Sequence, residues 1–252
     1  MPHSTLTDHV HSILGAIRSV PIPARPELTG QRPAPPFITI SREPGAGGWS
    51  LARHLVDALN IALPGEQAWT CWDKELVEKV AKDLHLSTTL IDRLEDRGHS
   101  WLTDFFESLT FSDASGHADE ARIYSRVAAT IRALAQAGRV VIVGRAGVFI
   151  TRKMPGGIHI RLIAPFQNRA DMFAREYHLT PEQAVANLKD LEHRRATFFR
   201  HYWPNEALSA ERFTLTINTA IVDQSTMVEM ITALVKRVVA KTEVPPSSIP
   251  VC

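Results

Sequence analysis

The chain has 252 residues, with 28 Lys or Arg against 27 Asp or Glu, so its formal net charge is +1. A chain of this length can bury a sizeable core in one α/β domain or in two small ones. The balanced charge supplies no basic field, which argues against nucleic acid or an anionic membrane as the main partner. Cys71 and Cys252 are far apart and lack metal-ligand spacing, and no apolar run or N-terminal signal segment directs the chain to a membrane. We therefore expect a cytoplasmic protein.

Residues 1–36 are predicted to form an appendage to the main domain. Their apolar residues fall at the spacing of one helical stripe, at Val10, Ile13, Leu14 and Ile17. A proline-rich and therefore stiff linker follows, up to Pro36. The helix can dock on the core, pair with a second subunit to form a homo-oligomer, or lie on a membrane surface. Its polar face carries His and Ser rather than Lys and Arg, which favours docking or pairing.

The segment Phe37–Leu59 predicts a short strand, a glycine-rich turn and an amphipathic helix. Phe37, Ile38 and Ile40 favour a strand, and a helical apolar pattern follows the turn. Three glycines stand within four residues, at Gly45, Gly47 and Gly48. Backbone N–H groups and the helix dipole at such a junction favour an anion, usually phosphate. The alternative is an ordinary strand-to-helix turn, although three glycines exceed what such a turn requires.

Further strands and helices are expected to alternate along the rest of the chain. Strands are predicted near 68–72, 139–143, 158–163 and 213–217, and helices include 119–137, a segment starting at Thr180, and 226–239. Residues 95–118 are predicted to form a mobile insertion and residues 241–252 a disordered tail. The alternation predicts an α/β fold with a mostly parallel sheet and helices on both faces. Since ligands bind beyond the carboxyl ends of such strands, the glycine loop, Asp73 and Gly144–Arg145 should share one edge.

Five short segments in this order resemble the cytidylate kinase-like family, a group related to nucleoside monophosphate kinases with the P-loop fold. They are Ile40–Gly48, Asp73–Val77, Val141–Ala146, Arg161–Pro165 and Ile217–Thr219. The resemblance covers residues 37–240 and implies a P-loop NTPase-type three-layer fold with a helical lid at 175–204. It also implies phosphoryl transfer from ATP with Mg²⁺ to a small acceptor. CMP and dCMP are the substrates of better-known relatives.

The resemblance also implies roles for individual residues. The donor phosphates would be cradled by Gly45, Ala46, Gly47, Gly48, Trp49 and Ser50, with Ser50 as a candidate Mg²⁺ ligand. Arg145 would meet the acceptor's phosphate, and Asp73 would orient the acceptor or a magnesium-bound water. Arg195 and Arg200 would belong to the lid. Guanidinium groups suit this work because they stay charged and bind phosphate oxygens through two hydrogen bonds. The alternatives are a helix cap for Asp73, a surface ion pair for Arg145 and a solvated helix face for the lid arginines.

Two departures from the expected pattern bear on activity. The standard loop, Gly-x-x-x-x-Gly-Lys-Ser/Thr, places a lysine where this chain has Gly48 or, with a shift of one, Trp49. Loss of one such charge-stabilising group costs on the order of a hundredfold to a thousandfold in rate unless it is replaced. Arg42 and Arg53 are the nearest candidates to replace it. Beyond Asp73, the chain lacks the small residues and arginine of true cytidylate kinases, so specificity for CMP is weakly supported.

Three functions therefore stay open at the level of the sequence. The first is an ATP-dependent kinase acting on a nucleoside monophosphate or another small acceptor. The second is a non-catalytic nucleotide-binding regulatory module, which the absent lysine favours. The third is a scaffold that holds partners through the helix at residues 8–18.

Overall fold

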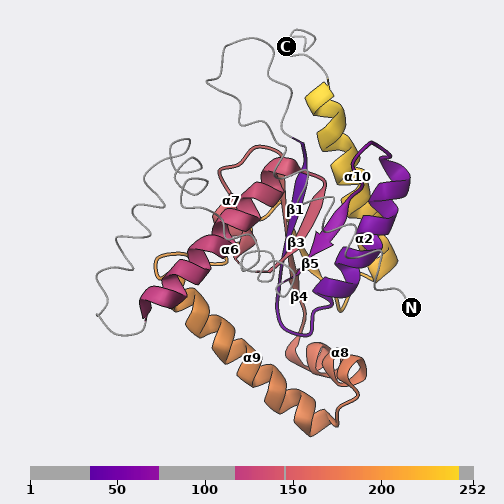
Figure 1. Ribbon diagram of the computed structural model, residues 1–252. Helices are drawn as coiled ribbons and strands as arrows, with labels where there is room; N and C mark the ends of the chain where they lie inside the picture. The colour runs from indigo at the N-terminus through magenta and orange to yellow at the C-terminus, as the bar shows by residue number, and fades with distance from the viewer. Residues whose placement is uncertain (1–34, 74–116, 145, 244–252) are drawn as a thin grey trace, which may run out of the picture.

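A computed structural model describes residues 35–73, 117–144 and 146–243 of the chain (Figure 1). Their centre is a five-stranded sheet in which every neighbouring pair of strands is parallel. In spatial order the strands are β2 (Thr70–Trp72), β3 (Val140–Val143), β1 (Phe37–Arg42), β4 (Gly157–Ile163) and β5 (Leu215–Asn218). All carboxyl ends therefore meet at one edge of the sheet, as the alternation of elements predicts.

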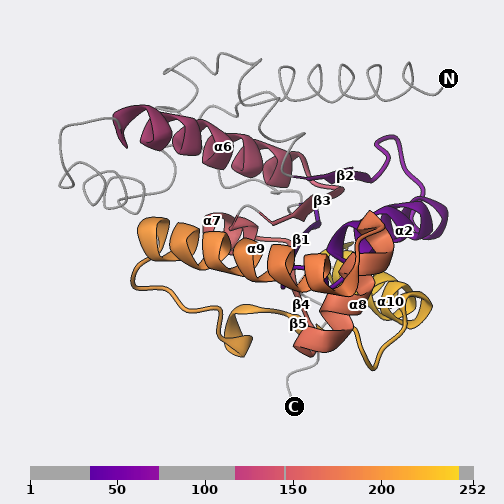
Figure 2. The ribbon, with the colours of Figure 1, turned by 90° about the horizontal axis from the view of Figure 1, so that it is seen from below.

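The described helices cover both faces of this sheet. They are α2 (Gly48–Ala62), α6 (His117–Ala137), α7 (Gly147–Thr151), α8 (Phe166–Tyr177), α9 (Pro181–Tyr202) and α10 (Gln224–Glu243), with a 3₁₀ turn at Ala210–Arg212. Figure 2 shows α2 and α10 together, with α6 across the sheet from them. The prediction of a three-layer α/β fold with a mostly parallel sheet is confirmed.

The side chains of β1 alternate between the two faces of the sheet, so this one strand contributes to both hydrophobic cores. Phe37 belongs to the core beneath α6 and α7, whereas Ile38 and Ile40 belong to the core beneath α2 and α10. Successive side chains of a strand point to opposite faces, so a strand buried on both sides is apolar throughout. The same division separates Val140 from Val141 in β3.

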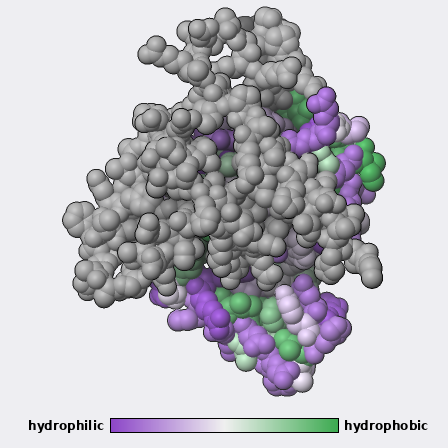
Figure 3. All heavy atoms as spheres, viewed as in Figure 1, coloured by the Kyte–Doolittle hydropathy of each residue, from purple (hydrophilic) through white to green (hydrophobic). Residues whose placement is uncertain are grey.

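Helices α8 and α9 extend away from the sheet (Figure 1), and the predicted lid region, 175–204, includes the end of α8 and all of α9. Thr180 caps α9 with a capping box, since Gln183 N donates to its Oγ1 at 3.3 Å and Thr180 N donates to Gln183 Oε1 at 3.0 Å. Pro181 stands at the first helical position, as the sequence predicts. The surface of this end of the molecule is largely hydrophilic, with hydrophobic residues interspersed (Figure 3).

Most element boundaries fall within a few residues of their predicted positions. The chief difference is α10, which continues to Glu243 and so includes the first residues of the predicted tail, 241–252. The predicted helix within residues 1–36 lies outside the described residues, as does the insertion at 95–118 except for the two residues that begin α6. Their predicted roles, including oligomerisation through the N-terminal helix, stay predictions.

A buried polar pair links β1 to β4 inside the sheet. The Nδ1 atom of His159 lies 2.8 Å from Oγ1 of Thr39, and both residues are buried. Burial lowers the pKa of His159 from 6.5 to about 4, so the folded protein holds a neutral imidazole at neutral pH.

This histidine predicts a specific loss of stability in mild acid. The unfolded chain protonates His159 near pH 6.5 and the folded protein does so only near pH 4, so the free energy of unfolding falls as the pH drops through this window. Between pH 7.5 and pH 5 its share of the loss is about 2 kcal/mol. Urea unfolding of wild type and His159→Asn at both pH values measures it, with exposed His178→Asn as control. Equal pH dependence in wild type and His159→Asn would contradict the prediction.

Candidate functional site

The turn between β1 and α2 depends on glycine at two positions. Gly45 and Gly47 have φ angles of 77° and 72°, a region that residues with a side chain rarely adopt. A Cβ on Gly45 would lie 2.5 Å from the carbonyl oxygen of Arg169 in α8. Gly45 therefore meets two requirements together, the turn itself and the close approach of another main chain.

The first turn of α2 is open to an acceptor from outside the helix. Its N-cap is Gly47, which has no side chain to accept hydrogen bonds from the following N–H groups. The first N–H groups of a helix have no partner within the helix, and they carry its positive dipole end. This loop and helix start thus form a cradle suited to phosphate oxygens.

Arg42 lies across this cradle. A Cβ on Gly48 would be 3.0 Å from Cγ of Arg42 and 3.1 Å from its Cδ. The Nη1 atom of the same side chain contacts Gly144, at the end of β3. Arg42 therefore passes from the end of β1 over the start of α2 toward the end of β3. By contrast, Arg53 is an exposed residue of α2 whose charge acts on Cys71.

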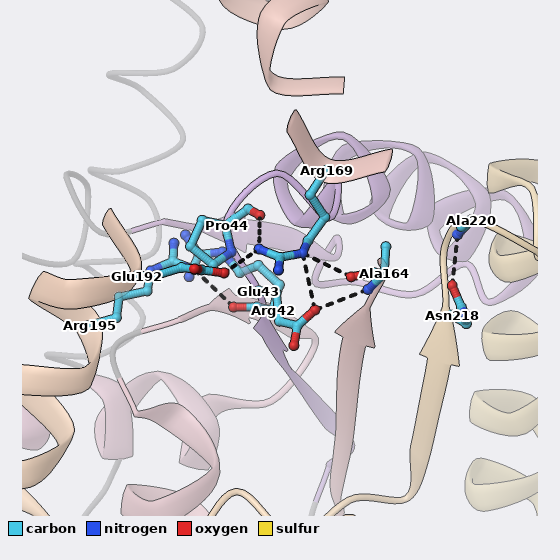
Figure 4. A network of polar contacts seen from close by, with 9 residues as sticks. All are labelled: Arg42, Glu43, Pro44, Ala164, Arg169, Glu192, Arg195, Asn218 and Ala220. Carbon is cyan, nitrogen blue, oxygen red and sulfur yellow. Dashed lines mark hydrogen bonds and ion pairs between the residues drawn. The ribbon is translucent and has the colours of Figure 1, made fainter. Parts of the chain in front are cut away.

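A second arginine reaches the same segment from α9. Nη1 of Arg195 donates to the carbonyl oxygen of Arg42 at 2.9 Å (Figure 4). Burial is the main cause that lowers the pKa of Arg195, followed by the charge of Arg169, while Glu192 opposes both. The Arg195 guanidinium is thus half-buried beside the loop and faces charges of both signs.

A cavity of about 370 Å³ lies beside the loop, at the carboxyl ends of β1, β3 and β4. Four arginines and one carboxylate supply its charges, and an apolar wall comes from α9 and the segment that follows it. The residues that line it are Ser41, Arg42, Glu43, Gly144, Ala146, Arg161, Leu191, Arg194, Arg195, Phe198, Phe199 and Leu208. This excess of positive charge suits an anionic guest.

The predicted lid arginines do not all approach the site. Arg195 lines the cavity, and so does Arg194, whose exposed side chain pairs with Asp190 at 2.6 Å. Arg200 is exposed and donates to Oγ1 of Thr197 at 3.3 Å. Because α9 is one unbroken helix, successive residues turn by about 100° and these arginines point in different directions.

The remaining predicted residues occupy varied positions. Asp73 follows β2 at the predicted edge, where its charge raises the pKa of the Cys71 thiol, after the larger effect of burial. Arg145 lies outside the described residues. Trp49, in the first turn of α2, is 39% exposed.

Ser50 faces α10. Its Oγ donates to Oε1 of Gln224 at 3.0 Å, and this bond ties the start of α2 to the start of α10. The hydroxyl oxygen keeps lone pairs for a cation, so the residue's chemistry fits a Mg²⁺ ligand. Among residues 35–73, 117–144 and 146–243, no cluster of three His, Cys, Asp or Glu side chains forms a metal site. Mg²⁺ binding by Ser50 stays a prediction.

Sequence reasoning assigned no role to two arginines that the structure places at the site. Arg161 in β4 lines the cavity, with its guanidinium 5.7 Å from the ring centre of Phe213. Arg169, 6% exposed, contacts the glycine loop from α8. A signal for Arg161 was its charge within a strand segment whose other residues, apart from His159, are apolar or glycine. For Arg169 the signal was its position one turn after Pro165, at the same sheet edge.

None of the described helices combines the length and apolarity needed to cross a bilayer.

Comparison with known proteins shows to which family the chain belongs. The model of the cytidylate kinase-like family matches residues 37–221, which is well over half of the chain. No curated protein matches the chain.

Solved structures add information about the fold. An uncharacterized protein from Eubacterium ventriosum ATCC 27560 is 20% identical with a TM-score of 0.59, over 80% of this chain and 98% of that one. Shikimate kinase from Acinetobacter baumannii, in complex with shikimate, is 16% identical with a TM-score of 0.40, over 81% and 94% of the two chains. A gluconokinase from Sinorhizobium meliloti 1021 is 12% identical with a TM-score of 0.43, over 83% and 97%.

The parallel sheet, the glycine loop between β1 and α2, and the match over residues 37–221 agree with one another. The chain belongs to the cytidylate kinase-like family.

Proposed function

We propose that the protein is a cytoplasmic P-loop kinase that transfers a phosphoryl group from ATP to a nucleoside monophosphate, such as CMP or dCMP, or to another small acceptor. The observation that carries the proposal is the arginine-lined cavity directly beside the glycine loop. In phosphoryl transfer, catalysis consists mostly of positioning and of stabilising charge. A phosphate cradle and an adjoining set of guanidinium groups provide both.

The donor would bind through the cradle. Residues Gly45 to Ser50 would hold its phosphates with backbone N–H groups, apart from that of Ala46, which donates to the carbonyl oxygen of Glu43 at 3.2 Å. Ser50 would supply an oxygen to Mg²⁺. ATP would supply the phosphoryl group, and Mg²⁺ would neutralise part of the negative charge on the phosphates. Trp49 is exposed enough to contact the donor at the mouth of the cradle.

Arg42 is our candidate for the task of the absent lysine. Its aliphatic stem lies 3.0 to 3.4 Å from the place where a Cβ on Gly48 would stand, and its guanidinium continues toward Gly144. A lysine at position 48 would compete with Arg42 for this space. The absence of a side chain at Gly48 leaves room for Arg42, and Arg42 supplies a positive charge beside the loop.

The acceptor would occupy the cavity. Arg161, Arg194 and Arg195 face it, and its only lining carboxylate among the described residues, Glu43, is already paired with Arg169. A volume of about 370 Å³ suits a small anionic molecule. We also propose Arg145 and Asp73 at this edge for the acceptor, and Arg200 as a lid residue that would need a bend in α9 to reach the transferring group.

The second candidate function is a non-catalytic nucleotide-binding regulatory module. The observation that favours it is the absence of the loop lysine, whose place is taken by Gly48 or, with a shift of one, by Trp49. This module would bind ATP in the same cradle without turnover.

One pair of measurements separates the two functions. We expect the purified full-length chain to release ADP from ATP and Mg²⁺ in a coupled assay with CMP, dCMP, UMP or AMP, and to bind ATP with Mg²⁺ by calorimetry. Binding without turnover with any acceptor would favour the regulatory module. Absence of both binding and turnover would exclude both functions.

Replacement of Arg42 tests its assigned task. We expect Arg42→Gln to lower kcat by on the order of a hundredfold, because one charge that stabilises the transferring group is lost. Arg53→Gln is the matched control, since Arg53 is an exposed arginine on α2. Its kcat should stay near that of the wild type. Equal kcat values for the two variants would show that Arg42 does not replace the lysine.

A further inference from the structure

We infer that Arg169 is a positioning residue that fixes the shape of the glycine loop and couples this loop to the lid helix α9. The inference rests on the proposed function, because the loop is there assigned to the donor phosphates. Arg169 lies in the first turn of α8, and its side chain is 8% exposed. Figure 4 shows its guanidinium among main-chain oxygens and carboxylates from three separate segments.

The first segment that Arg169 holds is the glycine loop itself. Its Nη1 donates to the carbonyl oxygen of Pro44 at 3.2 Å, and its Nε lies 3.3 Å from the carboxylate of Glu43. A contact to a main-chain carbonyl constrains the path of the backbone directly. Arg169 therefore holds the two residues that precede Gly45.

The main chain of Arg169 supports the same loop. Its carbonyl oxygen would lie 2.5 Å from a Cβ on Gly45, so the loop rests directly against the first turn of α8. The second segment, at the end of β4, is joined to this assembly. Ala164 accepts a hydrogen bond from Nε of Arg169 at 2.9 Å, and its N–H donates to Glu43 at 3.1 Å. The loop is thus attached to the sheet edge through one guanidinium and one carboxylate.

The third segment is the lid helix. Nη1 of Arg169 also donates to Oε1 of Glu192 at 2.6 Å. Glu192 and Arg195 are three residues apart, so they share one face of α9. Arg195 binds the carbonyl of Arg42 while Glu192 binds the arginine that holds Pro44. The helix is therefore tied to the residues on both sides of Glu43.

The chemistry of this position requires a guanidinium. The guanidinium places Nε against Ala164 and Glu43 and Nη1 against Pro44 and Glu192. An ammonium carries its three N–H donors on one nitrogen, which cannot occupy both places. The ring of Phe166 lies under the guanidinium, 5.4 Å from its carbon. Loss of the guanidinium would leave Glu43 and Glu192 less neutralised beside a site for phosphates, and their charge would then repel the donor.

Two variants distinguish the tie between Arg169 and the glycine loop from the tie between Arg169 and α9. Arg169→Lys removes Nη1, the one nitrogen that donates to both Pro44 and Glu192, and leaves a shorter side chain in its place, so both ties are lost. Glu192→Gln weakens only the tie to α9, since the bonds from Arg169 to Pro44, Ala164 and Glu43 persist. Arg175→Lys is the matched control, because Arg175 is an exposed arginine of the same helix.

We expect Arg169→Lys to weaken binding of ATP with Mg²⁺ by about tenfold in calorimetry, the equivalent of losing one charged hydrogen bond. Amide hydrogen exchange in both the loop and α9 should accelerate in this variant. Glu192→Gln should accelerate exchange in α9 alone, with ATP affinity within about threefold of the wild type. In Arg169→Lys, adding Glu192→Gln should change exchange in α9 no further, since the tie is already lost. Arg175→Lys should match the wild type throughout.

Wild-type ATP affinity in Arg169→Lys would overturn the positioning role, and unchanged exchange of α9 in Glu192→Gln would overturn the coupling. Glu192→Gln alters a partly exposed side chain, 37% accessible, so it decides the coupling even if Arg169→Lys fails to fold. If the wild type binds no ATP, the proposed function fails by itself. The exchange measurements still decide whether Arg169 ties the loop to α9.

Discussion

The contact between the glycine loop and the first turn of α8 is the constraint on which the site depends. Gly45 approaches the main chain of Arg169 so closely that no side chain fits between them. This approach brings the guanidinium of Arg169 within reach of Pro44 and Glu43, and α8 in turn places α9 over the loop. A glycine is usually explained by the turn that it permits. Here the absence of a side chain also determines where two helices lie.

The parallel sheet gathers charge that the chain distributes widely. Arg42, Arg161 and Arg195 come from β1, β4 and α9, yet they line one cavity because every strand ends at the same edge. The chain as a whole is almost neutral, so its strong local field is a product of topology. Two carboxylates near this edge, Glu43 and Glu192, are both engaged with Arg169.

The sequence predicts the fold well because its signals are local. The apolar run of β3 and the capping box at Thr180 each arise from adjacent residues, and the structure has both. The site is harder to predict, because its contacts join distant segments. Arg169 and Pro44 are 125 positions apart, and nothing near either residue reveals the bond between them. The arginines of α9 show the intermediate case. Helical geometry predicts that they diverge, but only the packing of α9 selects Arg195 as the one that donates to the carbonyl of Arg42, just before the glycine loop.

The close contact between the stem of Arg42 and position 48 has a consequence for substitutions at either position. A side chain introduced at 48 would lie 3.0 to 3.4 Å from the stem of Arg42, which would have to shift slightly to make room, and a small residue introduced at 42 would remove that stem together with one of the charges near the loop. The space for a side chain at 48 therefore depends on the residue at 42. The effects of substitutions at the two positions are therefore expected to be coupled rather than additive.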